Sequence, residues 1–205
     1  MANYLTLNGK RIDLTDEQVR EIESSFASDR IKLAEVAVGD TFKISEHEFV
    51  VLEQKEEESV VLLKDALPED IQFGEDNNNF ADENCIARKE LMKFADEIEV
   101  IVGTGNLVEH TVDLTSDDGL DDYGSVTAKV SIMTAPLSRK YVRITDKYKV
   151  DRWCWLATPH STPTHGNENW VKCVSPSGRV DCNDYDCSGG VRPFCILKSN
   201  IFVSK

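Results

Sequence analysis

The first thirty residues alternate between apolar and polar positions in a pattern typical of a small hairpin followed by a helix. Two short strands are predicted on either side of the Asn8-Gly9 turn. Thr15 is a good N-cap, and Gln18 stands three residues later, which completes a capping box. The apolar residues that then share one helical face are Val19, Ile22 and Phe26. We predict that residues 1–30 form an appendage that docks on the main domain or on a partner.

From residue 31 the hydrophobic period changes to that of strands, with two helices further along. Residues 70–79 are predicted to be a polar loop, Asp82 to be the N-cap of one helix, and Thr134 to precede another whose first turn holds Pro136. An antiparallel meander is predicted for 41–45, 48–54 and 59–64. The predicted apolar helix faces are Ala87, Leu91, Phe94 and Ile98, then Leu137, Tyr141, Ile144 and Tyr148.

The last third of the chain has a different composition. All three tryptophans, five of six cysteines and four of six prolines lie between 153 and 195, within loops of Thr, Pro, His, Gly, Asn and Asp. Short strands are predicted for 153–157, 170–174, 179–182 and 191–197. Strands, then helices, then short strands, without alternating βαβ units, predict an α+β fold with a mostly antiparallel sheet and two to three helices. Residues 31–205 are expected to form one domain.

Charge excludes some partners. The net charge of −14 argues against nucleic-acid binding, which needs clustered Lys and Arg. Residues 1–137 hold 12 basic and 31 acidic residues, whereas 138–205 hold 11 basic and 6 acidic ones. No apolar run is long enough for a membrane helix, and the first residues lack the features of a signal peptide. We therefore expect synthesis in the cytoplasm, no membrane insertion, and cysteines that remain thiols.

Candidate metal ligands occur in two loops, each with a simpler interpretation. Asp117, Asp118, Asp121 and Asp122 offer oxygen ligands suited to Ca²⁺, but aspartate is also common in solvated turns. A zinc site at the loop histidines is conceivable, although they lack paired metal-ligand spacing. No phosphate-binding loop, nucleophile elbow or zinc-protease motif occurs. No cofactor, resident metal or catalytic residue is predicted.

The run 181–188 is too polar for a core strand, so its side chains should meet solvent or a ligand. Its Asn, Asp, Tyr and Ser resemble a paratope in composition. Trp153 and Trp155 would share one face of a strand, at least one tryptophan should be buried, and Trp170 is expected nearest the surface. The predicted ligand-binding residues are His160, His165, Asn167, Asn169, Trp170, Asp181, Cys182, Asn183, Asp184, Tyr185, Asp186 and Cys187.

Three segments, 153–159, 170–178 and 190–194, resemble a domain family of gut bacteria, phages and mobile elements with the pattern W-W-L-(R/A)-(S/T)-P … G-V-R-P. Cys154 replaces the second tryptophan of that pattern. The resemblance implies a C-type-lectin-like fold, shared by formylglycine-generating enzymes and by the variable proteins of diversity-generating retroelements. In the variable proteins, residues just before a Gly-(Phe/Val)-Arg-Pro motif are diversified and bind ligand. The run 181–188 contains none of the Lys, Glu, Gln, Met and Trp that adenine-directed mutagenesis cannot produce.

The sequence leaves three classes of function open. We favour a non-enzymatic module of a phage or mobile element that binds a protein or a glycan, with Arg192 bridging backbone groups beneath the loops. The related fold also allows a copper oxidase that uses Cys182 and Cys187, which have the enzyme's separation but acidic neighbours. A virion or assembly component would instead use residues 1–30 to oligomerise.

Overall fold

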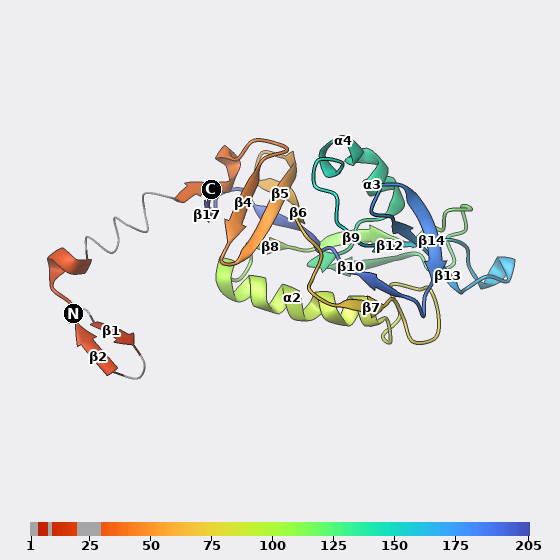
Figure 1. Ribbon diagram of the computed structural model, residues 1–205, viewed down its shortest axis with the longest axis horizontal. Coiled ribbons are helices and arrows are strands. Elements are labelled where there is room, and N and C mark those ends of the chain that lie inside the picture. Colours follow the sequence, from red (N-terminus) through yellow and green to blue (C-terminus); the bar gives the residue numbers. More distant parts are fainter. Residues whose placement is uncertain (1–3, 8–9, 20–29) are drawn as a thin grey trace.

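The computed structural model describes residues 4–7, 10–19 and 30–205 (Figure 1). The fold is α+β, and its strand pairing is mostly antiparallel. The larger sheet contains, in spatial order, β11 (Val130–Ser131), β16 (Phe194–Lys198), β6 (Glu58–Leu63), β5 (His47–Gln54), β4 (Thr41–Ile44), β17 (Phe202–Ser204) and β3 (Arg30–Lys32), and β8 (Leu107–Val108) also pairs with β16. The predicted meander is confirmed as β4, β5 and β6.

A second, five-stranded sheet carries the C-terminal third. Its order is β14 (Val180–Asp184), β13 (Trp170–Val174), β12 (Cys154–Pro159), β15 (Ser188–Gly190) and β7 (Asp70–Gln72). β12 and β15 are parallel at Cys154 and Gly190, whereas the other described pairs of this sheet are antiparallel. The predicted polar loop 70–79 is therefore wrong in part, because β7 joins this sheet and Phe73 is completely buried. A separate hairpin pairs β9 (His110–Asp113) with β10 (Ser125–Ala128).

The long helix α2 (Ile86–Val102) packs against β4, β7, β8 and β11. It buries the predicted face, and Gly103 ends it with a positive φ of 87°. Asp82 is not its N-cap. Cys85 occupies that position, and the Asp82 carboxylate instead accepts hydrogen bonds from the backbone N–H of Asn84 and from Asn77. Asp82 therefore caps a turn that precedes the helix, and the first helical residue is Ile86.

The second predicted helix begins where expected and divides in two. Thr134 caps α3 (Ala135–Lys140) by accepting a hydrogen bond from the Leu137 N–H at 3.4 Å. Tyr141 leaves the helical conformation before α4 (Val142–Thr145), yet its side chain is buried. The predicted apolar face packs despite the break, since Leu137, Ile144 and Tyr148 contact the same cluster as Tyr141. Short 3₁₀ helices occupy Leu33–Glu35 and Pro163–His165.

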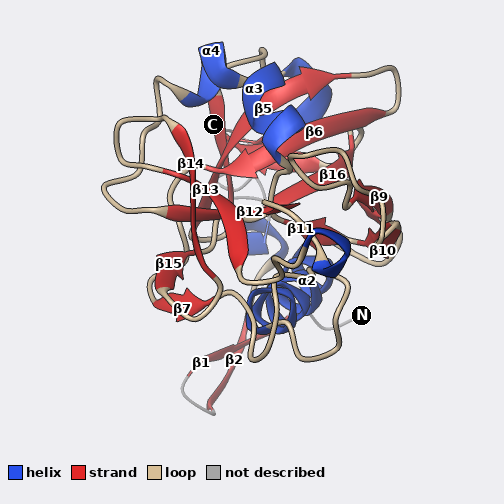
Figure 2. Ribbon diagram, turned by 90° about the vertical axis from the view of Figure 1, so that its right-hand side faces the viewer, coloured by secondary structure: helices blue, strands red, loops and turns tan. Residues whose placement is uncertain are grey.

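The core has two parts, one on each side of the strands. Figure 2 shows the backbones of these strands and of the helices. Val51 and Val61 enter the larger cluster with α2, while their neighbours Val50 and Leu62 enter the smaller cluster with α3 and α4. Successive residues of a strand point to opposite faces, so β5 and β6 need apolar side chains at nearly every position. Their continuous hydrophobic runs follow from this two-sided burial.

The N-terminal segment forms the predicted hairpin and helix start. β1 (Tyr4–Leu7) pairs with β2 (Lys10–Asp13). The capping box is confirmed: the Thr15 N–H donates to Gln18 Oε1 at 3.0 Å, and the Gln18 N–H donates to Thr15 Oγ1 at 3.2 Å. Residues 16–19 begin the helix, whereas the predicted apolar residues Ile22 and Phe26 lie outside the described residues.

Candidate ligand-binding face of the second sheet

The pairing of β13 with β14 decides which side chains share a face. Directly opposed residues in an antiparallel pair lie on the same side of the sheet. Trp170 opposes Asp184, and Lys172 opposes Cys182, so these four side chains lie on one face. Val171 and Cys173, on the other face of β13, are buried in the larger core cluster. We call the first of these the outer face.

Most of the outer face is covered. At one end, Val174 and Val180 pack into the smaller core cluster beneath α3 and α4. In the middle, Lys172 is buried, and its Nζ lies 3.1 Å from Asp117 Oδ2. Asp117 also accepts a hydrogen bond from Arg139 at 3.0 Å. The pKa of Asp117 is lowered because these two cations outweigh the opposing effect of burial.

The other end of the outer face is open and holds Trp170. This side chain is 45% exposed, compared with 42% for Trp153 and 2% for Trp155, so the prediction that Trp170 is nearest the surface is confirmed. The ring of Trp170 lies 6.2 Å from that of His160. Trp153 precedes β12, so the shared strand face predicted for Trp153 and Trp155 does not apply, and the buried Trp155 packs edge-on against Phe73.

The predicted run 181–188 does not form one continuous surface. None of its residues is buried, but it continues as strand β14 through Asp184, where the sequence predicted a loop after residue 182. Cys182 and Asp184 belong to the outer face, whereas Asp181 and Asn183 alternate to the opposite side. Tyr185 and Cys187 are half-buried and pack against the larger core cluster. Asp186 is exposed in the following turn.

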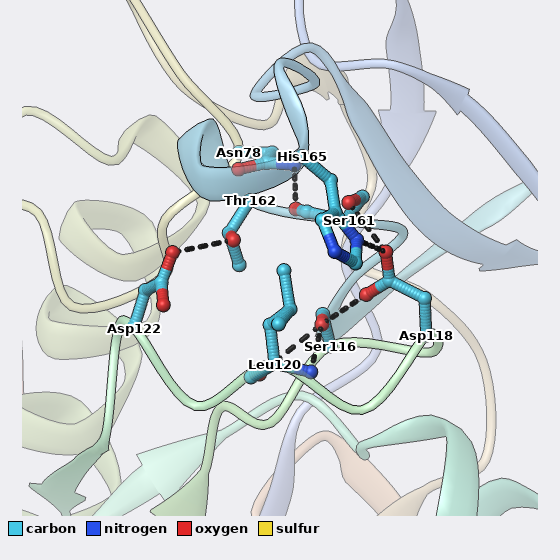
Figure 3. Close-up of polar contacts among 8 residues, drawn as sticks. All are labelled: Asn78, Ser116, Asp118, Leu120, Asp122, Ser161, Thr162 and His165. Atoms are coloured by element: carbon cyan, nitrogen blue, oxygen red, sulfur yellow. Dashed lines mark hydrogen bonds and ion pairs between the residues drawn. The ribbon is translucent and has the colours of Figure 1, made fainter.

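Two loops surround the open end and are fastened to each other (Figure 3). Asp118 accepts hydrogen bonds from Ser161 Oγ at 2.6 Å and His165 Nδ1 at 2.9 Å, and also from Ser116. These three donors, Ser116 first, hold the pKa of Asp118 well below its usual range. Asp122 accepts a 2.6 Å hydrogen bond from Thr162. The acidic loop and the segment 160–165 are therefore a single connected unit.

Asn78 anchors this unit to the rest of the domain, and nothing in its sequence context predicted that role. Its side chain is completely buried. The amide Nδ2 donates to the carbonyl oxygens of Ser161 at 3.0 Å and Trp170 at 2.9 Å, while Oδ1 accepts from the Tyr123 hydroxyl at 2.8 Å. The Asn78 N–H also donates to the Glu168 carbonyl at 2.9 Å. One amide thus connects three segments that are distant in sequence.

The remaining predicted contact residues lie around this frame. The exposed residue Asn169 accepts, at its carbonyl, a 2.8 Å hydrogen bond from the Tyr185 N–H. Asn167 is half-buried and accepts a 3.3 Å hydrogen bond from the Asn169 N–H at its side chain. Arg192 donates to the carbonyl oxygens of Leu63 at 2.8 Å and Lys64 at 2.6 Å. Its predicted bridging of backbone groups is confirmed.

The candidate metal ligands are engaged by protein donors. In the acidic loop, Asp117, Asp118 and Asp122 all accept hydrogen bonds from side chains, so calcium would have to displace these donors. Calcium at this loop stays a prediction. Within the described part of the chain, the one set of three residues close enough to share an ion is Glu46, His47 and Glu97, which lies elsewhere on the domain.

The two cysteines considered for an oxidase are both free thiols in half-buried positions. Burial raises the pKa of the Cys182 thiol, and this effect outweighs the attraction of Lys172. A copper-binding or nucleophilic cysteine acts as a thiolate, which a raised pKa disfavours. The surroundings of Cys182 therefore do not favour the oxidase alternative.

No family model, curated protein or solved structure matches this chain. In the described ranges 4–7, 10–19 and 30–205, none of the helices has the length and apolar character needed to span a bilayer.

Proposed function

We propose that this chain is a non-enzymatic ligand-recognition module that binds a protein or a glycan at the open end of the outer face. The contact set consists of Trp170 as anchor, ringed by His160, Asn169, Asp184 and Asp186. In this proposal the domain has the C-type-lectin-like fold of the family that its sequence resembles, and it belongs to a phage or mobile element. Diversification by a retroelement would then act on residues 181–188.

The observation that carries the proposal is an exposed tryptophan on a fixed backbone. The Trp170 carbonyl accepts hydrogen bonds from Asn78 at 2.9 Å and from the His160 N–H at 2.8 Å, while its side chain remains 45% exposed. A large aromatic surface that is already ordered loses little conformational entropy on binding. Tryptophan is also enriched among the residues that dominate binding energy.

The surroundings of Trp170 suit a ligand with many hydrogen-bonding groups. Asp184 lies directly opposite Trp170 across the strand pair, and Asn169 is exposed beside it in the chain. Carboxylates and amides of this kind can accept from hydroxyl or amide groups of a ligand, while the indole packs on an apolar surface. Sugars and peptide chains both combine these two features. The acidic character disfavours a phosphate-rich ligand.

The proposal is tested by comparing two exposed tryptophans. The labelled protein is screened on a printed glycan array and on a displayed peptide library, and its hits are remeasured with Trp170→Ala, Asp184→Ala and Trp153→Ala. Trp153 is the matched control because it is 42% exposed and lies outside β12. We expect the first two variants to weaken binding at least about tenfold, typical of a loss near 1.4 kcal/mol. Equal weakening by Trp153→Ala, or unchanged binding by Trp170→Ala, contradicts the proposal.

A further inference from the structure

A small cavity lies between α4 and the covered end of the outer face. Its volume is about 50 Å³. Apolar side chains make most of its wall, among them Val142, Leu156 and Val174, while Ser138 and Thr145 contribute hydroxyl groups. Apolar walls with a few polar groups are typical of small-molecule sites. The cavity contains none of the residues assigned above to the proposed ligand face.

The charged residues around this cavity are mainly cations. Lys149 pairs with Asp146 at 3.4 Å, and Arg152 pairs with Asp70 at 2.9 Å. Arg192 also lines the cavity, but it makes no ion pair with any described residue. Asp146 and Asp70 thus offset Lys149 and Arg152, and Arg192 is the one lining cation without an ion-pair partner among the described residues.

The guanidinium of Arg192 has unused binding capacity. It donates through Nε and Nη2 to two carbonyl oxygens, which leaves Nη1 without a hydrogen-bond partner among the described residues. Burial lowers the pKa of Arg192 to about 10, so the group stays charged at neutral pH. Asp65 attracts the guanidinium only from beyond ion-pair distance. Burial raises the pKa of the adjacent Cys154 thiol to about 11, so this thiol is neutral and supplies no counter-charge. A half-buried cation without a counter-charge is unfavourable, and an anion would relieve that.

The size of the cavity restricts the anion. A water molecule needs roughly 10–15 Å³ of such volume, so the space holds about three to five non-hydrogen atoms. That matches acetate or propionate. A carboxylate suits the planar donor geometry of arginine, and a short hydrocarbon suits the apolar wall. Phosphate would bring additional charge that the few hydroxyl groups here cannot solvate.

We propose that this cavity binds a small carboxylate, with Arg192 as its counter-ion and Leu156, Val174 and Val142 around its hydrocarbon part. The carboxylate is either a free short-chain acid or the C-terminal end of a peptide. This site is separate from the open end of the outer face, so it does not depend on the function proposed above.

The test is isothermal titration calorimetry of the whole protein with sodium propionate, in a buffer without carboxylates and at constant ionic strength. Arg192→Gln removes the charge, and Arg179→Gln is the matched control, because Arg179 is exposed and does not line the cavity. Val142→Phe is the second variant, needed if Arg192→Gln fails to fold. It narrows the cavity and leaves the hydrogen bonds of Arg192 intact, and Val142 is 40% exposed, so the larger side chain should be tolerated.

We expect wild-type protein and Arg179→Gln to bind propionate equally and more tightly than chloride. Arg192→Gln should weaken binding at least about tenfold because it removes the charge-assisted hydrogen bonds, and Val142→Phe should do so because it fills part of the cavity. A tripeptide with a free C-terminus is titrated as well, with its amide as the control that lacks the carboxylate. If the free tripeptide binds more tightly than propionate, the site is assigned to chain ends, and if it binds more weakly, the site is assigned to free acids. No binding of propionate, equal binding of chloride, or an unchanged affinity in Val142→Phe overturns the proposal.

Discussion

Replacing Asn78 with alanine should release the loops around Trp170 from the rest of the domain. The substitution removes two donated hydrogen bonds and one accepted one, all from a completely buried amide. The Trp170 carbonyl keeps its bond from the His160 N–H. The Ser161 carbonyl and the Tyr123 hydroxyl lose the only hydrogen bonds recorded for them among the described residues.

The magnitude follows from these two abandoned groups. A buried donor or acceptor that loses its partner costs about 1–3 kcal/mol, so Asn78→Ala should lower the free energy of unfolding by about 4 kcal/mol. For a domain of this size, 1 kcal/mol shifts the melting temperature by about 2–4 °C, which predicts a decrease of about 8–16 °C. Burial raises the pKa of Tyr123 to about 12, so its hydroxyl remains protonated and able to donate at all ordinary pH values.

The assay is urea unfolding followed by far-ultraviolet circular dichroism. Asn169→Ala is the matched control, because Asn169 lies in the same loop region and is exposed, and we expect it to change stability by less than about 0.5 kcal/mol. Tyr123→Phe removes one of the three bonds and should cost about 1–3 kcal/mol. The reasoning is refuted if the free energies of unfolding of Asn78→Ala and Asn169→Ala differ by less than about 0.5 kcal/mol, which is the ordinary effect of a surface substitution.

Two further outcomes can be measured in the same way. Gly178→Ala and Gly119→Ala should each destabilise by about 1–3 kcal/mol and by similar amounts, because both glycines have positive φ (87° and 92°). A Cβ at Gly178 would lie 2.7 Å from Asp146 Oδ1, but that atom ends a half-exposed side chain that can move aside, so a much larger loss at Gly178 would contradict this reasoning. Burial lowers the pKa of His110, so unfolding takes up a proton below the unfolded pKa of about 6.5, and stability is lost as pH falls. His110→Gln should therefore lose less stability between pH 7 and pH 5, and an identical pH profile would count against this.

Features set by residues close in the chain were predictable. The capping box of Thr15 and Gln18 uses partners three residues apart, and the cap at Thr134 is equally local. The buried face of α2 followed from helical spacing, because Leu91 and Ile98 must share a side of any helix that contains them. The meander of β4, β5 and β6 was visible because two-sided burial demands continuous apolar runs.

Features that depend on distant segments were not. The sequence placed residues 70–79 in a loop, yet β7 pairs there with β15 and Phe73 enters the core. Asp82 has a good capping side chain, but its turn closes before the helix begins. The polarity of 181–188 predicted an exposed surface, whereas pairing with β13 makes part of it an edge strand whose side chains alternate between two faces.

The sequence by itself determined the α+β class, the main helices and the polar character of the C-terminal third. The sequence also placed Trp170 nearest the surface, but only the tertiary structure decided that Trp155 is the buried tryptophan and that Asn78 connects the loops around Trp170. Local hydrogen bonds and hydrophobic periodicity are encoded within a few residues. Exposure is different, because it depends on which remote segment covers each face of a strand, and the identity of a residue does not specify that segment.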